Sequence, residues 1–383
     1  LKERGGGEMS DGQQGKQKGS LLRNSAFQTI LGSLLCIVIG LLVGYVVLLI
    51  INPQGAGKAI AAILKNFLYY PSAVAAKKYF GTTLVKASAL LMCSLSVLFA
   101  WKVGLFNIGA AGQYVIGAGA CLYCGLKFGM PWYLCLLAAI VAAALVGAVS
   151  GALKAYFNVN EVISCIMLNW IGLYVVNMLL TDVKEQTTPY TKPLASTNKS
   201  ALLPSMGLDR LFSNNDFVTI GLLLAVIAAV AIWILLEKTK FGYELKATGL
   251  NKNAAKYCGM REKTNIILTM MIAGGLAGLG AGIFYLTGIE QWMVQQTSVP
   301  AMGFNGIAAA FLGGSNPIGA IFASYFIQHI TSGGTYVDKT MYCSQISDLI
   351  SAFIIYLCGF VFFFRVRLNR YLDRRDERKG GGK

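Results

Sequence analysis

Charged side chains are scarce in this sequence. Asp, Glu, Lys and Arg make up 13% of its 383 residues, whereas a soluble domain carries roughly 25%. Uncharged stretches recur along the chain, at residues 24–57, 103–126, 128–153, 162–181, 217–236, 264–289 and 349–364. A helix that crosses a membrane needs about 20 predominantly apolar residues, and most of these stretches supply them. The scarcity of charge therefore excludes a soluble domain and predicts a protein that crosses the membrane several times.

The sequence also lacks the motifs of common catalytic sites. It has no G-x-x-x-x-G-K-[ST] loop, because the GAGKA segment at 55–59 lacks the first glycine and the Ser or Thr. It has no H-E-x-x-H motif or nucleophile elbow, and its one histidine, His329, lies in an apolar segment. Cys121 and Cys124 form a C-x-x-C pair without a second pair or a nearby histidine. We therefore expect no enzyme, no metal site and no cofactor bound by this chain.

The alternating pattern of a membrane β-strand is absent, so the spans should be α-helices. We predict an all-α polytopic membrane protein with about eight full spans and a pair of broken or half helices at 303–331. The full spans are expected near residues 26–51, 84–101, 107–127, 131–153, 161–181, 217–236, 264–288 and 346–365. The expected domains are a disordered cytoplasmic tail at 1–22, a transmembrane domain at 23–366 and a basic cytoplasmic tail at 367–383. Gly274, Gly278 and Gly282 form a double G-x-x-x-G pattern, which predicts close helix contacts.

Lysine and arginine set the expected orientation, because cytoplasmic loops are enriched in them. The net charge is +16, and the basic residues collect in the tails and in the 237–263 loop. This distribution favours an inside-positive topology over binding of nucleic acid. Both termini and the 237–263 loop are therefore predicted to be cytoplasmic, with the 182–216 loop outside. The 52–82 segment conflicts with this scheme, because it carries four lysines and no acid but is placed outside.

Two segments combine glycines with amides where a smooth apolar helix would be expected. They are LFNIGAAGQYVIGAGA at 105–120 and MGFNGIAAAFLGGSNPIGA at 302–320. Their polar residues include Asn107, Gln113, Asn305, Ser315 and Asn316. A helix cannot pass smoothly through GGSNP, and irregular backbone at membrane depth lines a cavity or is buried in protein. Close glycine contacts would explain either segment alone, but the pair, one in each half of the chain, favours the central pathway of a transporter.

A third polar group lies in NVNEVISCIMLNW at 158–170. Asn160 and Glu161 stand at the expected start of a span, where an N-cap and an acid near the helix N-terminus explain them as well as a functional role does. Asn169 lies about two turns further on, and an amide at that depth is expected to have a hydrogen-bonding partner.

The 240–260 segment, KFGYELKATGLNKNAAKYCGM, is rich in small residues at regular spacing. Its alanines and glycines predict short helices joined by a turn. A short helix with a small-residue face is suited to a groove on another protein, so this loop is expected to bind a soluble partner.

At these motifs the sequence resembles the membrane-spanning permease subunits of ABC importers of the simple-sugar, nucleoside and branched-chain amino-acid type. FNIGAAGQ at 106–113 is similar to the family's F-N-I-G-A-E-G-Q element, and NEVISCIMLNW at 160–170 is similar to N-E-V-I-S-T-x-M-L-N. The 242–260 segment resembles the coupling element G-x-x-L-R-A-x-G-x-N-x-x-A-A-x-x-x-G-I, and 303–320 resembles G-F-x-G-I-A-V-A-L-L-G-x-x-N-P-x-G. The likeness extends over about residues 84–365. Two departures are Ala111 at the usual Glu and Lys246 at the usual Arg.

The resemblance implies a permease in the bacterial plasma membrane that works with several other chains. These are ATP-binding subunits that use ATP and Mg²⁺, a second permease that is a paralogue rather than a copy, and an extracytoplasmic substrate-binding lipoprotein. It also implies that the 242–260 segment couples to the ATPase. The residues expected to take part are Gly242, Glu244, Lys246, Ala247, Gly249, Asn251, Ala254, Ala255 and Gly259.

The FNIGAAGQ element resembles the nucleoside and simple-sugar branch, and the expected cargo is a nucleoside. Its base would stack on aromatic side chains, and amides would meet its polar edge. The expected pathway residues are Phe106, Asn107, Gln113, Asn169, Trp170, Asn305, Ser315 and Asn316. Alternatives are a permease for a simple sugar such as ribose or galactose, an ion-coupled secondary transporter and a non-transporting scaffold. The secondary transporter is disfavoured because its ion ligands are scarce here, with only Glu290 and Asp348 near span ends.

Overall fold

A computed structural model describes residues 25–343, 345–358, 360, 366–367 and 370. The tails predicted at 1–22 and 367–383 lie outside these residues, apart from 367 and 370. Within the described part the chain is helical, and β-pairing is limited to isolated bridges between Lys184 and Thr191 and between Tyr190 and Met293. The helices are α1 (Ser25–Ile51), α2 (Ala56–Lys65), η2 (Asn66–Tyr69), α3 (Ala73–Lys102), α4 (Ala110–Lys127), α5 (Trp132–Phe157), α6 (Glu161–Leu180), η3 (Thr181–Val183), α7 (Leu194–Thr197), η4 (Lys199–Ala201), α8 (Leu208–Leu211), α9 (Gly221–Lys238), α10 (Lys240–Leu250), α11 (Lys252–Tyr257), α12 (Glu262–Tyr285), α13 (Ala301–Leu312), α14 (Pro317–Gly333), η5 (Gly334–Tyr336) and α15 (Ile346–Cys358).

Six of the described helices are long and apolar enough to cross a membrane: α1, α3, α5, α6, α9 and α12. They coincide with six of the eight expected full spans. α3 begins at Ala73, well before the expected 84, because the helix continues through exposed lysines at its start. The expected span at 107–127 is the shorter α4, which contains Gln113 and several glycines. The expected span at 346–365 begins as α15, and most of its last third lies outside the described residues.

α12 lies at the centre of the larger helix bundle and packs against α3, α4 and α5. Gly274 and Gly278 bring its backbone against the carbonyl groups of Ala143 and Ala139 on α5, so closely that a Cβ on either glycine would overlap them. The double G-x-x-x-G pattern thus forms a close helix contact, as predicted. α3 is the most deeply buried of the long helices, with 89% of its apolar window covered by the protein.

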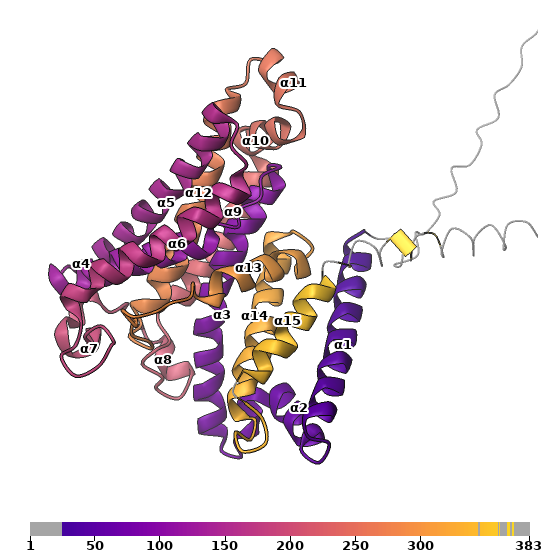
Figure 1. Cartoon of the computed structure of the whole chain (residues 1–383), viewed down its shortest axis with the longest axis vertical. Coiled ribbons are helices and arrows are strands. Elements are labelled where there is room, and N and C mark those ends of the chain that lie inside the picture. Colours follow the sequence, from indigo (N-terminus) through magenta and orange to yellow (C-terminus); the bar gives the residue numbers. More distant parts are fainter. Residues whose placement is uncertain (1–24, 344, 359, 361–365, 368–369, 371–383) are drawn as a thin grey trace, which may run out of the picture.

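The short helices gather at the two ends of the bundle (Figure 1). α10 and α11 project from one end, whereas α2, α7 and α8 lie at the opposite end. The 52–82 segment therefore lies at the end opposite to α10 and α11. This segment carries the four lysines that conflict with the expected topology.

A second, smaller cluster of buried apolar side chains joins α1, α2, α14 and α15. α1 stands at the flank of the molecule, where it contacts α15 and, near its end, α2. Only 22% of its apolar window is buried, so most of its surface is left open by this chain.

Candidate functional site

The turn between α3 and α4, residues 103–109, carries the first group of predicted pathway residues. Asn107 lies in this turn and is fully buried. Its Nδ2 donates to Ser96 Oγ on α3 at 2.9 Å and to Gln113 Oε1 on α4 at 2.8 Å. Gln113 Nε2 donates back to Asn107 Oδ1 at 3.2 Å. The two amides therefore pair with each other inside the protein and hold the irregular backbone of the turn in place.

Asn169 reaches the same place from α6. Its Oδ1 accepts from the backbone N–H of Gly112 at 2.8 Å, and its Nδ2 donates to the carbonyl of Ile108 at 3.2 Å. The first backbone N–H groups of a helix have no partner within the helix, and Gly112 is in the first turn of α4. Asn169 thus caps α4 from a neighbouring helix, which supplies the partner predicted for it.

The N-terminal turns of α4 and α13 meet at Ala111 and Gly303. A Cβ added to Gly303 would overlap the Ala111 backbone and stand 2.8 Å from the Ala111 Cβ. Two helix N-termini, each with partial positive charge, are thereby brought together inside the bundle. Ala111, which departs from the family motif, is the residue at this contact, and it is 1% exposed.

The predicted break in the GGSNP sequence is confirmed. α13 ends at Leu312 and α14 begins at Pro317. Gly314 and Ser315 adopt positive φ angles of 67° and 52°, which stop the first helix. Asn316 Oδ1 then accepts from the backbone N–H of Ile318 at 2.9 Å and caps the second helix, with Pro317 in its first turn.

The structure divides the eight predicted pathway residues into separate groups. Asn107, Gln113 and Asn169 form one buried cluster, whereas Ser315 and Asn316 lie in the turn between α13 and α14. Phe106 contacts Trp101 edge to face, and Asn305 is half-buried on α13. Trp170 is 43% exposed on α6 and stacks on Tyr174. Their role in substrate passage stays a prediction.

Two partners in this cluster were missed in the sequence. Ser96 lies in an apolar run of α3 and is buried, as is Cys165, whose Sγ lies 3.9 Å from Asn107 Oδ1. A serine inside a long apolar helix is a weak signal, because its hydroxyl can also bond to the preceding turn of its own helix.

The two polar residues at the start of α6, Asn160 and Glu161, have the structural role that the sequence offered beside a functional one. Asn160 Oδ1 accepts from the Val162 N–H at 2.9 Å and caps the helix. Glu161 forms a 2.8 Å ion pair with Lys154 at the end of α5. These residues thus join the ends of two adjacent helices.

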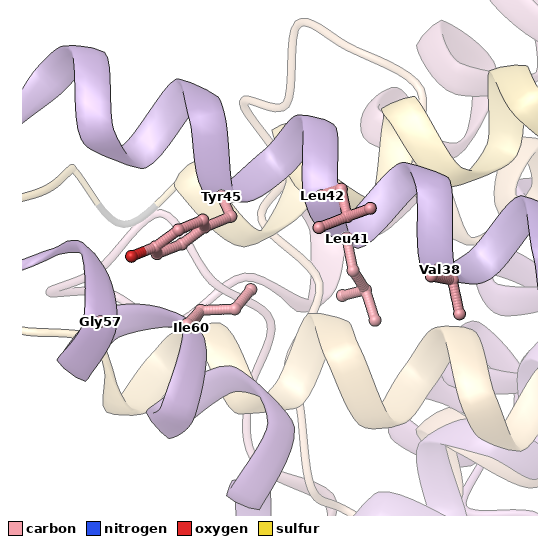
Figure 2. A pocket seen from close by; sticks show the side chains of 6 residues that line it. All are labelled: Val38, Leu41, Leu42, Tyr45, Gly57 and Ile60. Atoms are coloured by element: carbon pink, nitrogen blue, oxygen red, sulfur yellow. The ribbon is translucent and has the colours of Figure 1, made fainter.

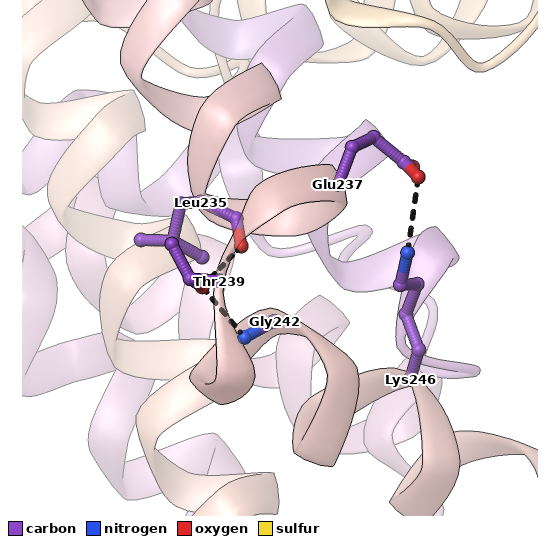
Figure 3. Close-up of polar contacts among 5 residues, drawn as sticks. All are labelled: Leu235, Glu237, Thr239, Gly242 and Lys246. Carbon is purple, nitrogen blue, oxygen red and sulfur yellow. Dashed lines mark hydrogen bonds and ion pairs between the residues drawn. The ribbon is translucent and has the colours of Figure 1, made fainter.

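The second candidate region is the elbow, defined as residues 239–259 with α10 and α11. Thr239 Oγ1 donates to the Leu235 carbonyl at 2.6 Å and accepts from the Gly242 N–H at 3.0 Å, which turns the chain sharply from α9 into α10 (Figure 3). Lys246 Nζ and Glu237 Oε2 form a 3.2 Å ion pair across the same turn (Figure 3). Asn251 accepts from the Asn253 and Ala254 N–H groups and caps α11. The predicted pair of short helices joined by a turn is confirmed.

The elbow is attached to the bundle at its base. Gly249 lies against the Val103 carbonyl and Gly104, so closely that a Cβ at 249 would overlap the Val103 carbonyl. Asn265 on α12 donates to Thr248 Oγ1 at 2.9 Å. Because Val103 and Gly104 begin the turn that carries Asn107, the elbow touches the candidate pathway segment directly.

The nine predicted coupling residues fall on different faces of the elbow. Gly242 and Ala255 are buried against this chain, and Gly249 makes the contact with Val103. Glu244, Lys246 and Ala247 are half-buried, whereas Asn251, Ala254 and Gly259 are exposed. Three large exposed side chains on the elbow were not among the predicted residues: Tyr243, Leu250 and Tyr257, which are 66%, 89% and 93% exposed. Large apolar or aromatic residues in an otherwise polar loop are the sequence signal that would have identified these three side chains.

None of the described residues forms a group of three or more His, Cys, Asp and Glu that could hold a metal ion. Cys121 is buried, Cys124 is half-buried, and both are free thiols.

The chain is similar to known transporter permeases. Residues 79–359 match the family model described as a branched-chain amino acid transport system permease component. The nucleoside ABC transporter permease protein NupB of Lactococcus lactis is 33% identical over 90% of this chain and 94% of its own. The guanosine permease NupP of Bacillus subtilis is 33% identical over 72% of this chain and 80% of its own. The glucose permease TsgB13 of Haloferax volcanii is 32% identical over 77% of this chain and 80% of its own. No solved structure matches the chain.

The family match covers most of the chain and includes the α3–α4 turn, the elbow and the break between α13 and α14. It agrees with the resemblance seen in the four motifs and with the six helices that can cross a membrane. The chain therefore belongs to the branched-chain amino acid transport system permease family and is a multi-pass permease component of an ABC importer, not an enzyme.

Proposed function

We propose that this permease imports nucleosides across a bacterial plasma membrane and is driven through its elbow by a separate ATPase. The observation that carries the coupling is the contact of Gly249 with Val103 and Gly104. A force applied to α10 acts on the turn of 103–109 without an intervening element. That turn holds Asn107, and through Gln113 and Asn169 it fixes the start of α4.

Movement of the turn would open the contact between α4 and α13. At the Ala111–Gly303 contact the backbone of Gly303 lies against the backbone and the Cβ of Ala111, so the two helices approach closely at two small residues. A rigid contact of this kind is either closed or separated, because close-packed backbone cannot be deformed gradually. We infer that the importer alternates between these two arrangements as the ATPase closes and opens.

The proposed topology has eight full spans and both termini in the cytoplasm. α4 and α15 would be the seventh and eighth spans, in addition to the six helices that meet the length and apolarity needed. The elbow and the α3–α4 turn would then face the cytoplasm. The partners would be ATP-binding subunits that use ATP and Mg²⁺, a paralogous second permease and an extracytoplasmic substrate-binding lipoprotein, while this chain binds no cofactor.

The nucleoside assignment is supported by the relatives named for nucleoside and guanosine transport. Trp170 and Tyr174 present stacked rings, 6.4 Å apart, on an exposed face of α6 and offer a surface on which a base could stack. Asn305 and Phe106 would be further contacts on the route. Asn107, Gln113 and Asn169 would shape it, since they already hydrogen-bond within the protein.

A sugar is the second candidate, because the relative from H. volcanii is named for glucose. The two are separated by uptake into proteoliposomes that contain the complete complex, with the binding protein and ATP supplied. Labelled guanosine should accumulate, and excess unlabelled glucose or ribose should not reduce it. Accumulation of the sugar, with no uptake of guanosine, would overturn the nucleoside proposal and leave the family assignment in place.

A further inference from the structure

An open apolar groove runs along α1 where α2 folds back beside it (Figure 2). Its volume is about 310 Å³. The lining residues are Val38, Leu41, Leu42, Tyr45, Gly57 and Ile60. Tyr45 closes one end next to Gly57, and its hydroxyl points away from Leu41 and Val38 (Figure 2). The groove is thus hydrocarbon along most of its length and has a polar group at one end.

The groove lies on a surface that this chain leaves uncovered. Val38 and Leu42 are 47% and 59% exposed, although both belong to a helix that can cross the membrane. Apolar side chains exposed at membrane depth contact lipid tails or another protein. A shallow apolar groove that is open along one side can hold a hydrocarbon chain against the protein and leave its other side to the surrounding lipid.

Two exposed lysines of α2 lie at the end of the molecule where this groove ends. Lys58 follows Gly57 directly and is exposed, and α2 also carries the exposed Lys65. The ion pairs of the described residues lie elsewhere, on Lys127, Lys154, Lys240 and Lys246. The nearby carboxylate of Asp338 accepts hydrogen bonds from the backbone N–H and the hydroxyl of Thr340. These bonds lower the pKa of Asp338 more than the charge of Lys58 does.

α2 has the character of a helix at the membrane surface. Its buried face is made of Ala56, Ala59, Ala62 and Ile63, and Lys58 and Lys65 lie outside that face. A group of tyrosines whose rings contact one another begins just after the end of α2. It consists of Tyr69, Tyr70, Tyr79 and Tyr336. Tyrosines and lysines that extend from apolar surface toward water are typical of the interface between hydrocarbon and headgroups. The groove therefore descends from the headgroup level into the hydrocarbon.

We propose that the α1–α2 groove binds an anionic phospholipid, with an acyl chain along Val38, Leu41 and Ile60 and its phosphate beside Lys58. An apolar furrow with a cation at its headgroup end complements this amphipathic anion. The site would also account for Lys58, which lies in a segment that the positive-inside rule would leave poor in lysine.

The test is native mass spectrometry of the full chain, with any subunits that copurify, released from detergent containing phosphatidylglycerol or phosphatidylcholine. The native protein should retain phosphatidylglycerol in preference to phosphatidylcholine. Lys58→Gln should reduce this preference about fivefold, the effect expected from one lysine near an anionic surface. Gly57→Leu, at a position where an added Cβ meets nothing within 4 Å, should fill the groove and reduce binding of both lipids.

Lys77→Gln is the matched control, since Lys77 is equally exposed at the same end but lies on α3 outside the groove. It should leave the preference unchanged. An equal loss in Lys77→Gln and Lys58→Gln would show that bulk surface charge attracts the lipid and would overturn the proposal. Unchanged binding in Gly57→Leu would also overturn it, as would a change in oligomeric mass, which would identify the groove as a subunit interface.

Discussion

The backbone of Gly249, near the end of α10, lies directly against the carbonyl of Val103, in the turn between α3 and α4. These residues are far apart in the sequence, and each belongs to a different candidate region. The contact joins the loop that is suited to a soluble partner to the turn that holds the buried amides. Under the proposed function, this contact is the path by which the ATPase would act on the start of α4.

The amide pair of Asn107 and Gln113 should behave as a structural unit. Asn107→Leu or Gln113→Met alone leaves a buried amide without its partner, which costs about 1–3 kcal/mol of stability. The double variant should cost less than the sum of the two, because neither amide is then orphaned. Thermal unfolding of the purified variants measures this cycle. Additive losses would contradict the pairing, and lost uptake at unchanged stability would instead place these amides on the substrate.

Asn169 should stabilise the start of α4. Asn169→Ala removes the acceptor for the Gly112 N–H and the donor to the Ile108 carbonyl. We expect a loss of about 0.5–2 kcal/mol, as for other capping residues, and faster hydrogen exchange at the first turn of α4. Met167→Ala, on the exposed face of the same helix, is the control and should leave exchange unchanged. Equal exchange in the two variants would argue against the cap.

Leu250 and Tyr257 should form the centre of the contact with the ATP-binding subunit. Replacing both by serine removes the large exposed side chains of the elbow, and affinity for that subunit should fall at least about tenfold, as at an interface hot spot. Met206→Ser, which changes a residue that is 77% exposed two positions before α8, should have no effect. Binding of the isolated ATPase subunit to immobilised permease measures both. Unchanged binding in the Leu250 and Tyr257 variant would remove the elbow tip from the interface.

Gly303 should tolerate no side chain. A Cβ there overlaps the Ala111 backbone, so Gly303→Ala must push α13 away from α4 and should cost about 1–3 kcal/mol. At Gly275 the nearest atom to an added Cβ is 3.5 Å away, and Gly275→Ala should be close to neutral. Melting temperatures of the two variants in detergent compare them. A Gly303→Ala protein as stable as Gly275→Ala would show that the two helix N-termini are not in contact.

Hydrophobic periodicity and charge were sufficient to predict most of the architecture. Five of the six long apolar helices, all except α3, lie where uncharged stretches predicted them, and the helix break at GGSNP follows from residues that cannot continue a helix. A lack of charge predicts a full span over the 107–127 segment. Its helix begins only at Ala110, because Asn107 is drawn into a tertiary amide pair. Local sequence could not show this, since the partners lie on α3, α4 and α6.

The candidate site was predictable in its residue types and not in its contacts. The sequence indicated that Asn169 needs a partner, but the backbone N–H of Gly112 is 57 residues away and becomes its partner only through the fold. On the elbow, the sequence predicted that small residues would contact the partner. Gly242 and Ala255 are buried against this chain, and Tyr243, Leu250 and Tyr257 present the exposed surface. The physical reason is that small residues permit close approach on the inner side, which leaves the large side chains outside.

The most direct test of the account is Gly249→Ala in the reconstituted complex, measured for ATP hydrolysis and nucleoside uptake in the same proteoliposomes. A methyl at 249 forces α10 away from Val103 but removes none of the large exposed side chains of the elbow, so the ATPase should still bind and hydrolyse ATP. Uptake should fall about tenfold or more, in the range of typical coupling energies, whereas Gly275→Ala, whose added Cβ meets its nearest atom at 3.5 Å, should transport normally. Uptake by Gly249→Ala at the native rate would contradict the central claim that the elbow drives the α3–α4 turn.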